Sequence, residues 1–113
     1  MADFHEENYR TLVETLIVMA AGDYIKWYWK KRHRNNTKYK TLWEERYMTY
    51  NPDPWKCSRA WTIHCRYIDK QVDTIERFLR DELAVYCELD AEEFIQRLRR
   101  KAMNGKKTFY ETL

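Results

Sequence analysis

The sequence predicts an all-α fold, a small antiparallel helical bundle of about four helices, two long and two shorter. Apolar residues recur at i, i+3, i+4 and i+7 over two long segments, which is the spacing of one face of an α-helix. The 113 residues include only two glycines and two prolines, too few for a turn-rich β-sandwich or barrel. A capping box marks the start of a further helix near the C-terminus. We expect a single helical domain over residues 1–104 and a loose tail over 105–113.

The first long helix is expected to begin between Phe4 and Asn8 and to end at about Lys31. Its main apolar stripe consists of Tyr9, Leu12, Val13, Leu16, Ile17, Ala20, Tyr24 and Tyr28. A second, narrower stripe consists of Val18, Ile25 and Trp29. With two apolar faces, this helix is expected to be central in the bundle or part of an oligomer interface. The small residues 20–22 are expected to admit another helix closely, which would justify the cost of about 1 kcal/mol that a helical glycine imposes.

The middle of the chain is expected to hold a loop, a short helix and a second long helix. Residues 33–38 are polar and predict the loop, and the short helix is expected from Thr41, its N-cap, to Tyr50. A turn over 51–54 follows, in which Asp53 caps the second long helix and Pro54 is its first residue. The stripe of this helix is Cys57, Trp61, Cys65, Ile68, Val72, Ile75 and Leu79. We expect a break near residues 80–81 and a separate turn over 82–87.

The last helix has the clearest start signals in the chain. Asp90 and Glu93 form a capping box, in which the Asp90 carboxylate accepts the Glu93 N–H and the Glu93 side chain reaches back to the cap. Leu89 and Phe94 have the spacing of a hydrophobic staple. The residues Asn104-Gly105 predict the end of this helix.

Several classes of site are missing from the sequence. Its two glycines are too far apart for a glycine-rich phosphate loop, and no Ser-His-Asp order or HExxH motif occurs. Cys57, Cys65 and Cys87 form no CxxC pair and are interpreted as free thiols, and no metal-ligand spacing stands out. We therefore predict a non-enzymatic protein with no catalytic residues, no metal ligands and no cofactor.

The N-terminus and the hydropathy predict the location of the protein. The first ten residues are acidic and polar, unlike a signal peptide, and no stretch approaches the ~18 apolar residues of a membrane span. We expect a soluble, cytoplasmic protein without a membrane partner.

A basic segment interleaved with aromatic residues is the first candidate binding site. Residues 25–42 hold seven cations and no acid, although the net charge of the chain is only +3. These cations are Lys26, Lys30, Lys31, Arg32, Arg34, Lys38 and Lys40. Cations neutralise phosphates, and the neighbouring rings of Trp27, Trp29 and Tyr39 could stack on unpaired bases, so the segment suits a nucleic acid or an acidic partner. The alternative is a helix C-terminus whose cations complement the helix dipole.

An aromatic-rich stretch is the second candidate site. Its proposed partner-binding residues are Trp43, Tyr47, Tyr50 and Trp55. Aromatic residues make up 16% of the chain, more than a bundle of this size easily buries. Aromatic side chains anchor protein interfaces, so this stretch is expected to bind a protein. The alternative is that these rings fill the core.

Two blocks of the sequence carry a family resemblance. Within residues 12–32 and 75–101 the relevant motifs are Asp23-Tyr24-Ile25-Lys26, Glu76-Arg77-Phe78-Leu79 and the Asp90-capped helix with Ile95-Gln96-Arg97-Leu98-Arg99. They resemble D-Y-x-K, E-R-F-F and I-x-x-L-R segments of small uncharacterised proteins from phages and integrated mobile elements of Firmicutes. Leu79 stands in place of a second Phe, Ala91 in place of a Gly, and residues 38–61 look like an insertion. The resemblance implies a phage or mobile-element accessory protein in the cytoplasm of a bacterial host.

Three functional hypotheses follow from these features. The first is an accessory protein that binds a host or phage protein, as an inhibitor of a host defence nucleoprotein in the manner of an anti-CRISPR protein. The second is a nucleic-acid-binding accessory protein that uses residues 26–40. The third is a homodimeric structural adaptor that pairs through the two apolar faces of the first helix.

Overall fold

The computed structural model describes residues 2–86 and 90–104, with side chains over 7–85 and 90–104. This part of the chain contains four helices and no strand, which confirms the predicted all-α bundle of two long and two shorter helices. The helices are α1 (Ala2–His33), α2 (Thr37–Tyr50), α3 (Pro54–Tyr86) and α4 (Ala91–Asn104). The predicted tail, the staple residue Leu89, Cys87 and the predicted stop at Gly105 lie outside the described residues.

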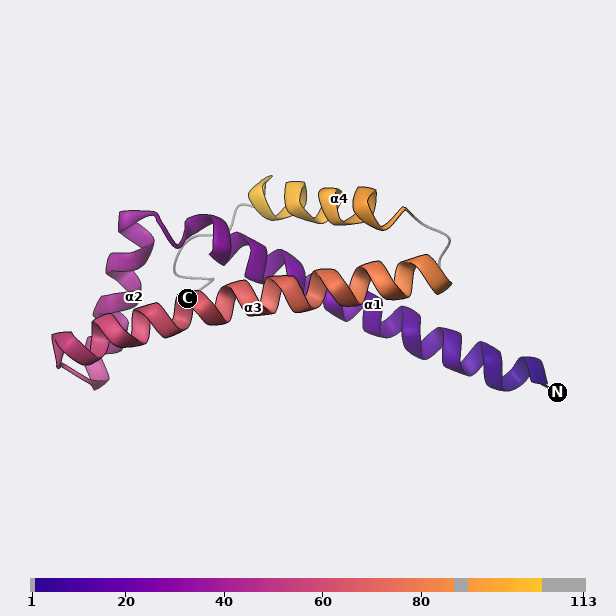
Figure 1. Ribbon diagram of the computed structural model, residues 1–113, viewed down its shortest axis with the longest axis horizontal. Helices are drawn as coiled ribbons and strands as arrows, with labels where there is room; N and C mark the ends of the chain where they lie inside the picture. The colour runs from indigo at the N-terminus through magenta and orange to yellow at the C-terminus, as the bar shows by residue number, and fades with distance from the viewer. Residues whose placement is uncertain (1, 87–89, 105–113) are drawn as a thin grey trace.

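The two long helices run in opposite directions, and the middle of α1 crosses the second half of α3 (Figure 1). α4 runs back over both of them from the end of α3, while α2 lies across the other end of the molecule. The first half of α1 extends past the crossing, so the molecule is elongated, with extents of 61 × 26 × 19 Å. None of the described helices has an apolar stretch that could span a bilayer.

The connection between α1 and α2 is shorter than the sequence predicts. α1 continues to His33, and α2 begins at Thr37 with Asn36 as its N-cap. The Asn36 side chain accepts the backbone N–H of Lys38 at 2.9 Å. The expected loop to Lys38 and the expected cap at Thr41 are therefore wrong, because Asn36 is itself a strong cap and the extra turn buries Tyr39 completely.

α3 begins as predicted and continues further than predicted. The Asp53 carboxylate accepts the Trp55 N–H at 2.9 Å, which confirms Asp53 as the cap. The expected break near residues 80–81 is wrong, since α3 runs unbroken to Tyr86. Leu79 and Leu83, one turn apart, are both fully buried, and this packing holds the last turns in the helix.

The predicted capping box of α4 forms only in part. One Asp90 carboxylate oxygen accepts the N–H groups of Glu92 at 3.0 Å and Glu93 at 3.3 Å. The Glu93 side chain, however, accepts a hydrogen bond from Arg97 at 2.7 Å, one turn further along, and does not close the box. The charged partner one turn away draws this carboxylate from the cap.

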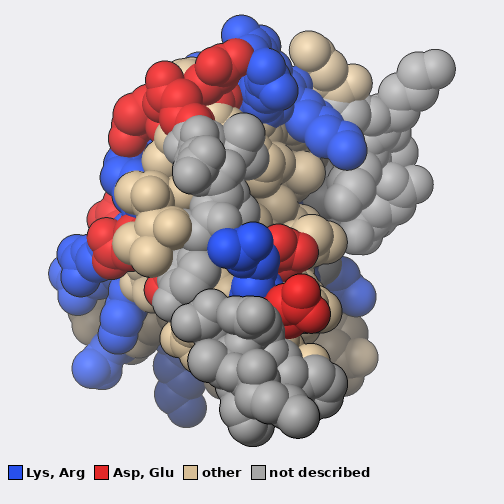
Figure 2. Space-filling model, turned by 90° about the vertical axis from the view of Figure 1, so that its right-hand side faces the viewer, with Lys and Arg blue, Asp and Glu red and all other residues tan. Residues whose placement is uncertain are grey.

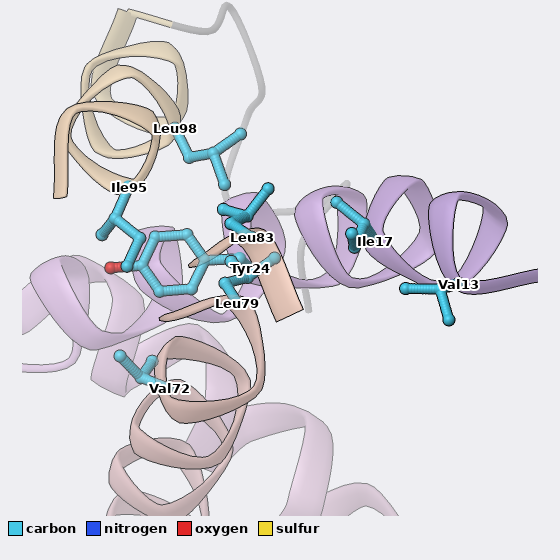
Figure 3. Packing of buried hydrophobic residues seen from close by; sticks show 8 residues of the cluster. All are labelled: Val13, Ile17, Tyr24, Val72, Leu79, Leu83, Ile95 and Leu98. Carbon is cyan, nitrogen blue, oxygen red and sulfur yellow. The ribbon is translucent and has the colours of Figure 1, made fainter. Parts of the chain in front are cut away.

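The main core lies where α1, α3 and α4 meet. Its buried residues are Val13, Ile17, Tyr24, Val72, Leu79, Leu83, Ile95 and Leu98. Figure 3 shows the Tyr24 ring between Ile95 and Val72. The predicted close approach at Gly22 is wrong, because a Cβ there would meet no atom within 4 Å. Leu12 and Leu16 of the predicted stripe stay 55% and 42% exposed, whereas their neighbours Val13 and Ile17 are buried, so only one side of the stripe is covered.

Candidate functional site

A polar network inside the main core joins three helices. The Tyr24 hydroxyl donates to Glu76 Oε1 at 2.6 Å, and Arg99 Nη2 donates to the same oxygen at 2.8 Å. Arg99 Nε donates to the Tyr24 hydroxyl oxygen at 2.9 Å, which closes the triangle. Arg80 extends the network, with Nη2 at 3.4 Å from Glu76 Oε2 and an ion pair to Glu92. Because the bonds are directional and join α1, α3 and α4, this network fixes how the three helices pack.

The charges in this network are mutually stabilised. Burial opposes ionisation of Glu76, but the hydrogen bonds from Tyr24 and Arg99 and the charges of Arg99 and Arg80 outweigh it, so its pKa lies below the ordinary value. Burial and the hydrogen bond to Glu76 raise the pKa of Tyr24, so its hydroxyl stays protonated. The Tyr24, Glu76 and Arg99 side chains thus satisfy one another's hydrogen bonds inside the core.

A second cluster, dominated by aromatic rings, holds α2 against α1 and α3. The Tyr39 ring is fully buried. Its centroid lies 5.8 Å from that of Trp29, in an edge-to-face arrangement, and 6.1 Å from that of Trp61. Trp43 contacts Trp61 edge-on and stacks on His64, each at 5.2 Å. Burial, followed by the charge of Lys30, lowers the pKa of His64.

The four predicted partner-binding residues divide into two pairs. Trp43 and Tyr47 are half-buried and stack on each other at 5.4 Å, so they belong to the aromatic cluster. Tyr50 and Trp55 are 88% and 77% exposed and flank the turn between α2 and α3. We call Tyr50, the turn 51–53 and Trp55 the tip. The structure therefore packs one pair into the aromatic cluster and leaves the other pair on the surface.

The basic segment is also divided by the structure. Lys30 is buried, with its Nζ 4.6 Å from the centre of the Trp27 ring, and burial together with the charge of Lys26 lowers its pKa. Arg34 forms an ion pair with Asp69 and donates to the Cys65 carbonyl at 3.2 Å. Lys31 Nζ lies 3.9 Å from the same Asp69 carboxylate. Three of the seven predicted cations thus face inward or toward α3.

The other four predicted cations remain on the surface. They are Lys26, Arg32, Lys38 and Lys40. Lys26 and Lys40 place their ammonium groups 5.7 Å from Trp27 and 5.8 Å from Trp61, which are cation–π distances. The four surface cations come from different turns of α1 and α2, so they do not form a single row.

Positive charge is concentrated at the end of the molecule that carries α2. Residues 24–72, which form this end in Figure 1, contain twelve Lys or Arg against four Asp or Glu, a net charge of +8. The rest of the chain contains nine against fourteen, a net charge of −5. Figure 2 views the opposite end and shows acidic side chains gathered along one side.

Two features of the structure were not predicted from the sequence. The Tyr24–Glu76–Arg99 network joins residues far apart in the chain, and each of them has an ordinary helical context in sequence. The outer face of α3 carries Arg59, Arg66, Lys70 and Arg77, all exposed. Residues spaced by seven, four and seven positions share one face of a helix, so the sequence alone could have predicted that these four cations lie together.

An apolar groove lies beside Gly22, between α1 and α4. It has a volume of about 460 Å³, and Val18, Gly22 and Ile25 of α1 and Phe94 and Leu98 of α4 contribute to its lining. Nothing in the described residues occupies it.

The described side chains, those of residues 7–85 and 90–104, include no group of three His, Cys, Asp or Glu residues that could hold a metal ion. Cys57 and Cys65 are free thiols, and burial raises the pKa of both. Comparison of the chain with protein-family models, curated proteins and solved structures finds no match.

Proposed function

We propose that this chain is a non-catalytic binding protein that engages a protein partner through its tip. The observation that carries the proposal is the exposure of Tyr50 and Trp55, 88% and 77%, on either side of one short turn. An exposed tryptophan leaves a large apolar surface in water, and burying such rings against a partner is a major source of interface energy.

The base of the tip is held in place, which favours binding. The Asn51 backbone N–H donates to the Tyr47 carbonyl at 3.1 Å, and its side-chain amide donates to the Tyr47 hydroxyl at 3.3 Å. On the other side of the turn, Asp53 caps α3 beneath Trp55. Because the turn is ordered before binding, less conformational entropy is lost when a partner covers the two rings.

The resemblance of residues 12–32 and 75–101 to phage and mobile-element proteins suggests the biological setting. In that setting the chain is an accessory protein in the bacterial cytoplasm that occupies a host or phage protein. A host defence nucleoprotein is the target we propose, with the chain acting as an inhibitor. The tip belongs to the segment that departs from the family pattern, which suits a role particular to this chain.

The test is affinity capture of partners from a Firmicutes lysate with nuclease present, comparing the full-length chain with a Tyr50→Ala/Trp55→Ala variant. The matched control is Val85→Ala, which removes an exposed apolar side chain from the far end of α3. We expect the tip variant to lose binding by roughly 30-fold or more, as for interface hot spots, and the control to retain it. A partner that binds the tip variant and the wild type equally well would refute the proposal.

A homodimer is a second candidate, favoured by exposed apolar residues on the part of α1 that extends past the crossing. Leu12, Leu16 and Met19 follow each other at helical spacing and are 55%, 42% and 61% exposed. Light scattering at high protein concentration tests this candidate. A dimeric mass that returns to monomer in Leu16→Glu would support it, and a monomeric mass for the wild type would exclude it.

A further inference from the structure

We propose that the outer face of α3 binds single-stranded nucleic acid. Arg59, Arg66, Lys70 and Arg77 are called the α3 row. At 100° and 1.5 Å per residue, these four side chains lie within about 40° of each other around the helix axis and extend over about 27 Å. All four are exposed. They therefore form a straight line of positive charge on one rigid element.

The α3 row is not neutralised by the rest of the described structure. No ion pair within residues 7–85 and 90–104 involves any of its four members, whereas Arg34, Arg80, Arg97 and Arg99 are all paired with carboxylates. Two exposed carboxylates, Asp73 and Asp81, lie near the C-terminal end of the row. They do not cancel its four cations, so the net charge of this face is positive. Arginines that stabilise this fold are paired, so the unpaired row is available to an external anion.

Apolar and aromatic side chains lie beside the row. Ile63 and Tyr67 are 57% and 48% exposed and follow one another by one turn. The Tyr67 ring is held edge-on to Trp27 at 5.3 Å, and the Lys30 ammonium lies against that same Trp27 ring. A supported ring beside a line of cations matches the combination that binds unpaired strands, in which phosphates meet cations and bases stack on rings.

The position of the row in the molecule strengthens this assignment. Three of its members belong to residues 24–72, the end with a net charge of +8, and only Arg77 lies beyond it. A polyanion approaching the elongated molecule is attracted to this end, because the sequence outside residues 24–72 carries a net charge of −5. The Tyr67 ring favours a single strand over a duplex, because the bases of a duplex are already stacked on each other.

The test measures fluorescence anisotropy of a labelled single-stranded oligonucleotide of about 15 nucleotides with the full-length chain. Salt is varied from about 50 to 200 mM. The row variant is Arg59→Ser/Arg66→Ser/Lys70→Ser, and its charge-matched control is Arg10→Ser/Arg100→Ser/Lys101→Ser, made from exposed cations elsewhere. Circular dichroism confirms that both variants fold.

We expect the row variant to reduce the log–log salt slope by about 2, since each phosphate contact with a single strand contributes about 0.7. The control variant is expected to keep nearly the wild-type slope. Tyr67→Ala is expected to weaken binding by roughly 5- to 150-fold without changing the slope, because stacking on one base contributes about 1–3 kcal/mol.

Three outcomes would overturn the proposal. Equal losses in the row and control variants would show that diffuse charge, and not the row, attracts the strand. A duplex that binds as tightly as the single strand, with no effect of Tyr67→Ala, would remove the single-strand assignment. Polyglutamate that displaces the oligonucleotide at matched charge concentration would reassign the row to an acidic protein.

This inference and the proposed function can fail separately. The tip variant Tyr50→Ala/Trp55→Ala is expected to bind the oligonucleotide as the wild type does, because neither residue belongs to the row. If it does, loss of protein capture and loss of nucleic-acid binding report on different residues, even though Trp55 is only one turn from Arg59.

Discussion

The two core clusters of this molecule are built by different means. Where α1, α3 and α4 meet, aliphatic side chains surround a polar triangle in which Tyr24, Glu76 and Arg99 bond to one another. Where α2 joins, aromatic rings pack edge-on and face-on, and the buried Nε2 of His64 has no hydrogen-bond partner among the described residues. The first cluster depends on directional bonds with one geometry, while the second depends on ring contacts that several geometries satisfy about equally well.

This difference suggests how the chain combines stability with binding. The triangle permits one arrangement of three helices and so gives α3 a fixed direction over its whole length. The aromatic cluster attaches α2 and the tip to the first half of α3. Loss of a ring contact should therefore loosen the tip before it affects the rest of the bundle.

The largest effect is expected from Glu76→Ala, which leaves Arg99 without its partner inside the core. Removing one member of a buried ion pair typically costs about 3–5 kcal/mol, and we expect a loss in that range in urea unfolding. Glu76→Gln should cost less, because an amide oxygen can still accept from Tyr24. Asp73→Ala, which removes an exposed carboxylate from the same helix, is the control and should change stability by less than about 0.5 kcal/mol. Equal effects of the two alanine variants would show that the triangle adds no stability.

The aromatic cluster is tested by Trp61→Ala. Trp61 contacts Tyr39, Trp43 and His64 but is only half-buried, so we expect a loss of about 2 kcal/mol, below the 3–5 kcal/mol of a fully buried tryptophan. Trp55→Ala, at the exposed tip, should leave the unfolding midpoint nearly unchanged. Proteolysis of Trp61→Ala is expected to cut first near the turn between α2 and α3. Cleavage that begins in α4 would contradict the separation of the two clusters.

The predictions that held depend on short-range interactions, although two local expectations, the cap at Thr41 and the closed box at Asp90, were wrong. The four helices, the Asp53 cap and the Asp90 cap depend on residues within one or two turns of each other, and they are found as expected. The break near residues 80–81 and the close approach at Gly22 depended on which helix lies nearby, and both expectations were wrong. Local spacing reports which residues share a face, but not which face is covered.

The candidate sites show the same limit. Sequence composition identified the aromatic stretch and the basic segment, but exposure separates Trp55 from Trp43 and places Lys30 inside the fold. Exposure depends on how α2 and α3 pack against α1, which is a long-range property. The α3 row could have been found from its spacing, because the face opposite an apolar stripe on an amphipathic helix is its solvent face.

A smaller effect, of opposite sign, is expected from Gly22→Ala. The alanine Cβ would meet no atom within 4 Å, and Gly22 has helical neighbours on both sides. The variant should be more stable by about 1 kcal/mol, the difference in helix propensity between the two residues. Thermal unfolding measures the gain, and Ala21→Gly, a change of the reverse kind at the neighbouring position, should lower stability. A loss of stability in Gly22→Ala would mean that a segment packs into the groove beside it.

The smallest effect is expected from the protonation of His64. Burial and the charge of Lys30 lower its pKa in the folded chain below the ordinary value of 6.5, so the unfolded chain binds the proton first as the pH falls. Stability must then decrease as the pH falls through the window below about 6.5, because the unfolded state takes up more protons there. Glu76, with its lowered pKa, loses its stabilising charge only at more acidic pH and does not contribute to the pH dependence in this window.

Urea unfolding at about pH 7.5 and 5.5 should therefore show a decrease in the stability of the wild type. His64→Phe keeps a ring against Trp43 without a titrating group, and its stability should change less between the two pH values. An equal decrease in His64→Phe would assign the pH dependence to other groups.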